Sequence, residues 1–264
     1  MILGVSHIVL GSTAVGEDAR FLGQLGYTPT FIAYSIPTAP QKRKYMIGHS
    51  NAQAIAYCRP EDGISIELIQ YDDQLFPGPS PCHLVFPVLR RADLPEMSPA
   101  PLLARAWAAS GRGTLKAAQA DRFATALYWS ESSGPSQLLM EVPDLDAARR
   151  LFESGFQFRT TDRGLGWCVC VRRSLVRQWE ASLLLVENSS APVLASLDSA
   201  GFRCLSFLSS DLAVDRTEIL KAGVLSSTGV FGLTVNAKPL QLEMFEGPRG
   251  LVVEVLQVDK LRVP

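Results

Sequence analysis

The chain repeats one pattern, an apolar strand followed by a helix, four times along its length. The strands of this pattern are residues 5–10 (VSHIVL), 82–88 (CHLVFPV), 136–142 (SQLLMEV) and 203–208 (RCLSFL). The helical stretches after the first, third and fourth strands begin with acidic residues and end near a glycine, as helix starts and ends commonly do. Self-similarity at a regular period indicates a fold built from copies of one small unit.

The ends of the units repeat as well. Residues 60–70 read PEDGISIELIQ and residues 248–257 read PRGLVVEVLQ, so both join a Pro–Gly turn to an apolar strand that carries Glu and ends at Gln. Residues 183–188 and 125–131 are weaker copies. The sequence therefore predicts four βαβββ modules, each of roughly 50–70 residues, at 1–75, 78–133, 134–192 and 199–264. The second module is the least regular, because its alanine-rich segment LKAAQA at 115–120 could extend a helix instead of forming a strand.

One such module cannot close a core alone, because its helix covers one face of the sheet and leaves the other open. Two modules side by side complete a curved sheet with a hollow that suits a ligand. We expect an α+β fold in which four modules pair into two curved mixed sheets with helices outside. The favoured pairing joins modules 1 and 2 in a domain at 1–133, and modules 3 and 4 in a domain at 134–264. The alternative joins module 1 to module 4.

Residues with metal-ligating side chains recur at one register of these strands. The first strands carry His7, His83, Gln137 and Cys204, and the last strands carry Glu67, Glu187 and Glu254, with Glu131 in the weakest copy. A polar side chain within an apolar strand costs free energy unless it is paired, metal-bound or solvated. A single such histidine is most often a hydrogen-bonded strand residue. Two of the three histidines fall in this one column, which favours a ligand function.

Three segments give the chain a resemblance to the vicinal oxygen chelate superfamily, which includes glyoxalase I, bleomycin-resistance proteins, fosfomycin-resistance enzymes and extradiol dioxygenases. They are the opening VSHIVLGSTAVGEDARFLGQLGY, its echo at 136–156, and the ending Pro-x-x-Gly-Ile-Ser-Ile-Glu-Leu. The resemblance implies a divalent metal ion (Fe, Mn, Ni, Co or Zn) held by His or Gln from a first strand and Glu from a last strand. The substrate would chelate this ion through two neighbouring oxygens, and the ion would act as a Lewis acid.

Under the favoured pairing the resemblance implies that His7, Glu67 and His83 bind the metal. Under the alternative pairing Cys204 and Glu254 join His7 and Glu67, and Cys204 departs from the family pattern. The implied reactions are isomerase, lyase or dioxygenase chemistry, and no catalytic base is assigned. Ring-cleaving relatives are expected to keep the metal in the C-terminal half, which counts against a dioxygenase here. The alternative function is a metal-free protein of the same fold that binds or sequesters a small molecule.

Composition narrows the class of partner. The chain has 25 Lys and Arg against 26 Asp and Glu, with no block of like charge, so we expect neither nucleic acid nor a membrane as a partner. Five cysteines without a CxxC motif predict reduced core residues in a cytoplasmic protein, and the opening residues do not resemble a signal peptide. The expected partner is a small-molecule substrate, and a homodimer is left open. The basic segment QKRKY at 41–45 is predicted to be a solvated loop.

Overall fold

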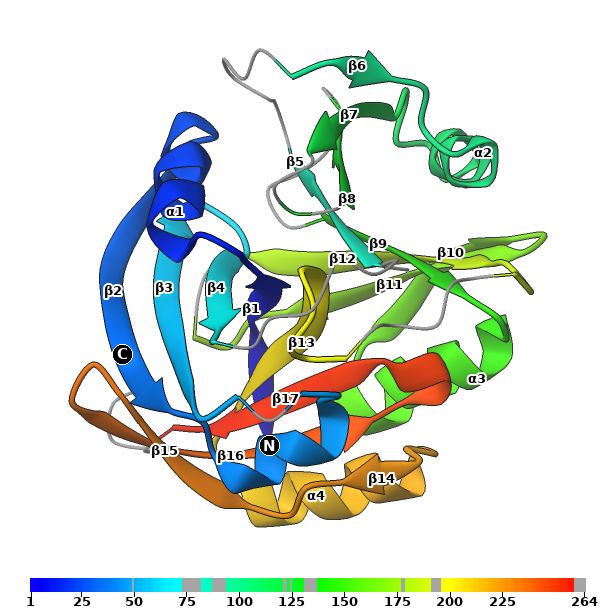
Figure 1. Cartoon of the computed structure of the whole chain (residues 1–264). Helices are drawn as coiled ribbons and strands as arrows, with labels where there is room; N and C mark the ends of the chain where they lie inside the picture. The colour runs from blue at the N-terminus through cyan, green and yellow to red at the C-terminus, as the bar shows by residue number, and fades with distance from the viewer. Residues whose placement is uncertain are drawn as a thin grey trace.

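The computed structural model contains two mixed β-sheets of nine and eight strands that share one apolar core (Figure 1). It describes residues 1–48, 50–72, 82–86, 94–120, 123, 125–130, 137–176, 179–190 and 196–258. Four strand–helix modules are present, as the sequence predicts, and the fold class is confirmed.

Modules 1 and 4 are the most regular. Module 1 consists of β1 (Ile2–Gly11), α1 (Val15–Gln24), β2 (Tyr27–Pro37), the 3-10 helix η1 (Pro40–Tyr45), β3 (Ala52–Pro60) and β4 (Ser65–Tyr71). Module 4 consists of β13 (Gly201–Ser209), α4 (Leu212–Lys221), β14 (Ser226–Ser227), β15 (Phe231–Val235), β16 (Lys238–Glu246), the 3-10 helix η4 (Pro248–Gly250) and β17 (Val252–Gln257).

Modules 2 and 3 form the other sheet. Module 2 consists of β5 (Cys82–Phe86), β6 (Glu96–Met97), α2 (Pro101–Ala109), β7 (Lys116–Ala120) and β8 (Thr125–Trp129). Module 3 consists of β9 (Gln137–Val142), α3 (Leu145–Arg150), the π-helical turn η3 (Leu151–Gly155), β10 (Arg159–Gly164), β11 (Trp167–Arg173) and β12 (Glu180–Glu187). The alanine-rich segment of module 2 is therefore the strand β7 and does not extend a helix.

The order of the strands shows that the favoured pairing of modules is wrong. The first sheet runs β14-β16-β17-β13-β1-β4-β3-β2, so module 1 pairs with module 4, and β5 pairs with β9 in the second sheet. The sheets thus do not divide the chain into 1–133 and 134–264. The pairing with β13 gives a physical reason: it runs from Ile2 opposite Ser209 to Gly11 opposite Gly201, so it supplies hydrogen-bond partners along the length of the β1 edge.

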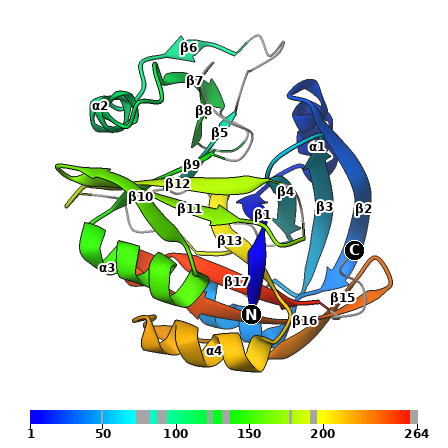
Figure 2. The ribbon, with the colours of Figure 1, turned by 180° about the vertical axis from the view of Figure 1, so that it is seen from behind.

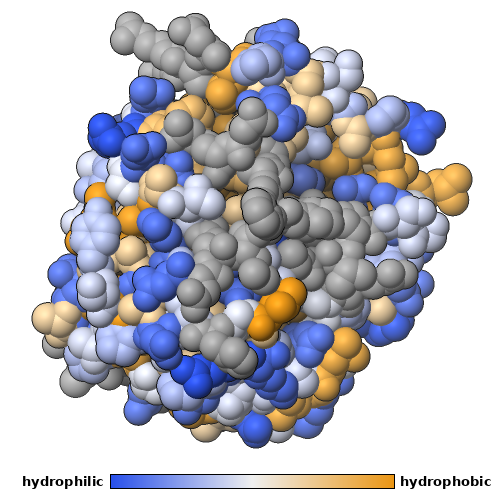
Figure 3. Space-filling view, viewed as in Figure 1, coloured by the Kyte–Doolittle hydropathy of each residue, from blue (hydrophilic) through white to orange (hydrophobic). Residues whose placement is uncertain are grey.

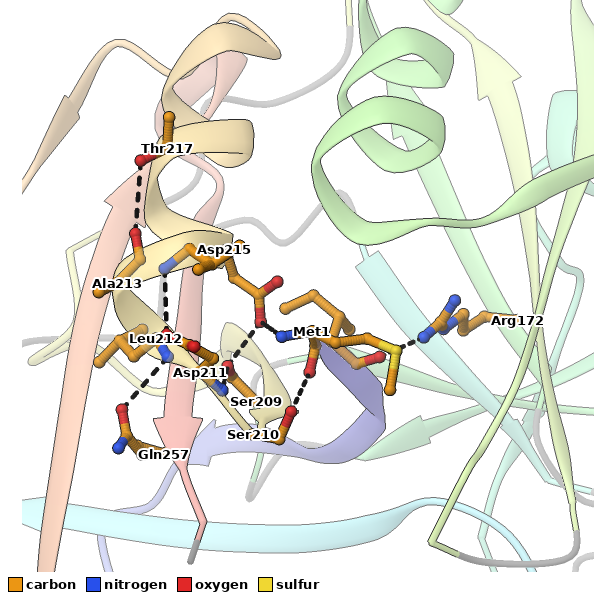
Figure 4. A network of polar contacts seen from close by, with 12 residues as sticks. Met1, Arg172, Ser209, Ser210, Asp211, Leu212, Ala213, Asp215, Thr217 and Gln257 are labelled. Carbon is orange, nitrogen blue, oxygen red and sulfur yellow. Dashed lines mark hydrogen bonds and ion pairs between the residues drawn. The ribbon is translucent and has the colours of Figure 1, made fainter. Parts of the chain in front are cut away.

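Modules 1 and 4 repeat a set of hydrogen bonds at the start of their helices, which supports their descent from one unit. In module 4, Ser209 donates to Asp215 and Gln257 accepts from the Leu212 backbone N–H (Figure 4). In module 1, Ser12 donates to Asp18 at 2.5 Å, and Gln70 accepts from the Val15 N–H at 3.0 Å. The strand-ending Gln that the sequence repeats is therefore a cap for the first turn of each helix. In module 4, Asp215 also pairs with the Met1 amino group at 3.0 Å.

The buried apolar residues form three clusters. The largest joins the two sheets and the helices α1, α3 and α4, and α3 and α4 lie on the same side of the molecule in both views (Figures 1 and 2). A second cluster lines the other face of the first sheet, and a third lines the corresponding face of the second sheet. On this last face α2 packs through the fully buried Trp107, so one helix lies in a hollow and not outside the sheets as expected.

The exposed surface carries no large apolar area on the side shown in Figure 3, where hydrophobic residues are scattered among hydrophilic ones over the coloured part. None of the helices in the described ranges has the length and hydropathy to cross a membrane.

Candidate functional site

Three ligand-type side chains meet on the hollow face of the first sheet. His7 lies on β1, Glu67 on β4 and Glu254 on β17. In the strand pairing, Glu67 is the partner of Val9 on β1, and Glu254 is the partner of Ser206 on β13. His7 Nε2 is 3.7 Å from a Glu67 carboxylate oxygen and 3.6 Å from a Glu254 oxygen. The predicted pair His7 and Glu67 therefore shares one site, and the third member is Glu254, from the alternative pairing.

Neighbouring hydroxyls hold these side chains. His7 Nδ1 is 3.0 Å from the Ser6 Oγ, and Ser206 Oγ donates to Glu254 Oε2 at 2.8 Å. Tyr57 meets the His7 ring edge to face at 5.5 Å between centroids. An imidazole whose Nδ1 has a hydrogen-bond partner is oriented with Nε2 toward the carboxylates.

The site is one end of a pocket with a volume of about 230 Å³. Its walls are mainly apolar: Phe31 and Tyr57 stack on one side, and leucines of the β15–β16 hairpin form the other. Leu242 and Leu256 are among these wall residues. A mostly apolar pocket with a few polar groups at one end is typical of a small-molecule site.

Lys42 is the residue that sequence reasoning missed. Its side chain lines the same pocket and the residue is only 3% exposed, so the predicted solvated loop at 41–45 is wrong for this position. Lys42 Nζ donates to Gln53 Oε1 at 3.5 Å. The basic run itself was the available signal, but nothing in its spacing distinguishes the inward lysine from the exposed Arg43 and Lys44.

The charges in the pocket perturb one another. Burial, and after it the Glu254 carboxylate, raises the pKa of Glu67 to about 8, against the opposing effect of Lys42. Burial likewise raises the pKa of Glu254. For Lys42, burial lowers the pKa, but Tyr71 and the two carboxylates outweigh burial, and the pKa is raised overall. Lys42 is therefore an ammonium ion, whereas the two carboxylates compete for a proton when no cation lies between them.

These shifts predict how the metal-free protein responds to pH. Because the pKa of Glu67 rises from 4.5 unfolded to about 8 folded, the folded state holds a proton that the unfolded state releases. Stability should therefore fall as pH rises from about 5 to 8, with a slope from this group of at most about 1.4 kcal/mol per pH unit. Urea unfolding in chelator at several pH values measures the slope, and Glu67→Gln should flatten it. An equal slope in both proteins would contradict the assignment.

The side chains fit a metal ion in donor type and spacing. Two donors bound to one ion at about 2.0–2.2 Å lie at most about 4.4 Å apart, and both spacings to His7 Nε2 are shorter than this limit. In the part of the chain that the structure describes, no three His, Cys, Asp or Glu side chains already close around one point. Small side-chain rotations would therefore have to complete the coordination. One imidazole with two carboxylates suits Fe, Mn, Ni, Co or Zn.

His83 lies elsewhere, on β5 of the second sheet, so the predicted set of His7, Glu67 and His83 is not brought together. His83 packs against Tyr128 with 4.7 Å between ring centroids, and burial lowers its pKa to about 4. The imidazole is therefore neutral, and it lies in the hollow of the second sheet with the buried residues around α2. Its position matches that of His7 in the module, but its surroundings do not.

Strand register explains why Glu67 and Glu254 have no glutamate at the matching positions in the described parts of modules 2 and 3. In each module, the residue two positions after the candidate on the first strand pairs with a residue on the last strand. These pairs are Val9 with Glu67, Val85 with Tyr128, Leu139 with Leu184, and Ser206 with Glu254. Modules 2 and 3 thus place Tyr128 and Leu184 where modules 1 and 4 place glutamates. Glu187 is exposed and lies three residues beyond Leu184, and Glu131 lies outside the described residues.

Arginine occupies the second hollow. Arg112 donates to Gln137 Oε1 at 3.1 Å and to Ser182 Oγ at 2.6 Å. Gln137 is thus engaged in a hydrogen bond to a guanidinium. Cys204, the counterpart of His7 in module 4, is buried in the apolar cluster of the first sheet, and burial raises its pKa well above the usual value of a thiol. Cys204 is not among the residues that line the pocket of His7 and Glu67, although the charges of Glu254, Lys42 and Glu67 act on its thiol.

Comparison with known proteins supports the fold. No protein-family model matches the sequence, and no curated protein is significantly similar to it. Among solved structures, glyoxalase I from Zea mays superposes with a TM-score of 0.55 at 12% identity, covering 96% of this chain and 92% of that one. A candidate dioxygenase from Bacillus subtilis superposes with a TM-score of 0.57 at 10% identity, covering 97% and 85%. The chain therefore has a glyoxalase-like fold, and the fold that the resemblance implies is confirmed.

Proposed function

We propose that this chain is a divalent-metal-dependent enzyme of the vicinal oxygen chelate type that acts on a small oxygenated molecule. The observation that carries the proposal is the meeting of His7, Glu67 and Glu254 in one pocket whose remaining walls are mainly apolar. The Glu254 carboxylate adds to the raised pKa of Glu67, and a bound cation would relieve this repulsion.

In this proposal His7, Glu67 and Glu254 hold the ion, which when bound supplies Lewis-acid stabilisation to two neighbouring substrate oxygens. Ser6 and Ser206 orient two of the ligands, as hydrogen-bonded residues around metal sites commonly do. Phe31, Tyr57 and the leucines of the hairpin exclude water from the substrate and select for size.

The reaction class within this proposal is isomerase, lyase or dioxygenase. The objection that both histidines lie in the N-terminal half no longer separates these classes, because the site draws ligands from modules 1 and 4 and so from both ends of the chain. A cytoplasmic location and a homodimer stay predictions.

The second candidate is a metal-free protein of the same fold that binds a small molecule. Lys42 favours it, because a buried ammonium already places one positive charge in the pocket with the two carboxylates. In that case Lys42 would balance one glutamate and a proton would neutralise the other.

Metal analysis separates the two candidates. Protein stripped with chelator, then incubated with Fe(II), Mn(II), Ni(II) or Zn(II) in turn and desalted, should retain about one equivalent of at least one ion. Elemental analysis of the desalted protein gives this stoichiometry directly. Retention of none of the four would refute the metal-dependent enzyme and leave the binding protein.

A further inference from the structure

The buried ammonium of Lys42 has few partners for its charge. An ammonium carries three N–H donors, and the acceptor that the structure gives to Lys42 Nζ is Gln53 Oε1, at the 3.5 Å limit of a hydrogen bond. Gln53 is itself 1% exposed, and its Nε2 has no hydrogen-bond partner in the described part of the chain. These two neighbouring buried groups thus have more N–H donors than acceptors, which costs free energy unless a further acceptor binds them.

Lys42 belongs to the pocket that holds the candidate metal ligands, and Gln53 lies on the same face of the sheet. Lys42 lines this pocket directly. Gln53 lies on β3 at the same alternation as Ile55 and Tyr57, whose side chains line the pocket, so it shares their face. The acceptor that would satisfy Lys42 and Gln53 can therefore be part of a ligand in the pocket.

Charge balance indicates the class of that ligand. If a divalent ion binds, as the proposed function requires, its two positive charges cancel those of Glu67 and Glu254. The Lys42 ammonium then remains without a counter-charge, and Lys238, an exposed residue that also lines the pocket, adds no negative charge. A buried charge of this kind is stable only when it is paired.

We propose that Lys42 binds a negatively charged oxygen of the substrate, and that the substrate is a monoanion such as an oxygenated carboxylate. This inference rests on the proposed function and adds the class of substrate to it. Gln53 is a positioning residue in this arrangement: its Oε1 accepts from the ammonium and orients it, and its Nε2 is directed to the same anion.

A matched pair of probes tests the role of charge. Pyruvate and pyruvamide both carry two neighbouring oxygens and are close in size, but only pyruvate is charged. Affinity for each is measured by isothermal titration on Ni²⁺-treated wild type, Lys42→Met and Lys44→Met. Lys44 is the control, because it is exposed and donates to the Ser227 carbonyl outside the pocket.

The wild type should bind pyruvate about tenfold or more tightly than pyruvamide, the ratio expected for one hydrogen bond between charged groups. Lys44→Met should keep that ratio, and Lys42→Met should lower it about tenfold, because the preference of the bound ion for a carboxylate oxygen is the same in all three proteins. Lys42→Met removes a positive charge beside Glu67 and Glu254, so Ni²⁺ is kept present to balance these carboxylates, and thermal melting checks that the variant is folded. Lys42→Gln serves as a second variant that should lower the ratio equally.

The outcomes separate this inference from the proposed function. If Ni²⁺ binds and Lys42→Met keeps the wild-type ratio, the role of Lys42 is refuted and the metal site stands. If Ni²⁺ does not bind but the wild type prefers pyruvate and Lys42→Met does not, the metal-dependent function fails and the anion site stands. If the wild type shows no preference for pyruvate with or without Ni²⁺, Lys42 is a structural counter-charge and the inference is overturned.

Discussion

Glu254→Gln is expected to weaken the binding of Ni²⁺ by at least about 100-fold. Loss of a hydrogen-bonded residue around a metal site typically costs 10–100-fold in affinity, and Glu254 is itself a proposed ligand. The substitution removes both a donor oxygen and one of the two negative charges that face His7. It also removes the repulsion between Glu67 and Glu254, so the stability of the metal-free protein should not fall. Titration of stripped protein with Ni²⁺, followed calorimetrically, measures the change.

His83→Gln is the matched control for this experiment, because it also introduces a glutamine at one of the repeated positions that carry ligand-type side chains. His83 lies in the hollow of the second sheet beside Tyr128, away from β1, β4 and β17. We expect Ni²⁺ affinity within about twofold of the wild type for this variant, since a residue that contacts neither ligand nor ion has little effect. Wild-type affinity in Glu254→Gln, or a large loss in His83→Gln, would show that the metal does not bind at the first sheet.

The contrast between these two residues shows what the sequence can and cannot predict. The repeated pattern predicted four strand–helix modules, and the structure confirms them. Local patterns determine strands because side-chain alternation is a local property. Which module pairs with which depends on how two distant strand edges fit together in the folded protein, and a local pattern carries no such information.

The same limit applies to the candidate site. His7 and Glu67 belong to one module, and β1 pairs with β4 within it, so their proximity follows from local topology. Glu254 reaches them only because β13 pairs with β1, across almost the whole chain. Glu187 was misplaced for another reason: Leu184 occupies the register position of the ligand, and Glu187 lies an odd number of residues beyond it, on the other face of the strand.

Lys42 could not be placed from its own segment. Charged runs are most often solvated, and three of the five residues in QKRKY are basic. The 3-10 helix η1 turns Lys42 inward and leaves Arg43 and Lys44 outside. This orientation depends on where β2 ends and β3 begins, and so on the finished sheet.

The contact between the two sheets should dominate stability, and Phe207 tests it. Phe207 on β13 is fully buried, stacks on Phe156 of module 3 with 4.5 Å between centroids, and meets Phe158 edge to face at 6.1 Å. These rings join modules that lie in different sheets. Phe207→Ala should therefore lower the free energy of unfolding by about 3–5 kcal/mol, because it leaves a cavity that a rigid, close-packed core fills only in part.

Val214→Ala is the control for this experiment, since Val214 lies on α4 with 57% of its surface exposed. We expect a change of no more than about 0.5 kcal/mol there. Urea unfolding followed by circular dichroism measures both variants, and the slope with urea should match that of the wild type if the protein unfolds as one unit. If unfolding instead occurs in two phases, and Phe207→Ala shifts only one of them to lower urea, the sheets unfold separately. Because Phe207 points to the core and the neighbouring Ser206 to Glu254, Phe207→Ala should lose stability while it keeps one equivalent of bound metal, which separates the packing of the sheets from the chemistry of the pocket.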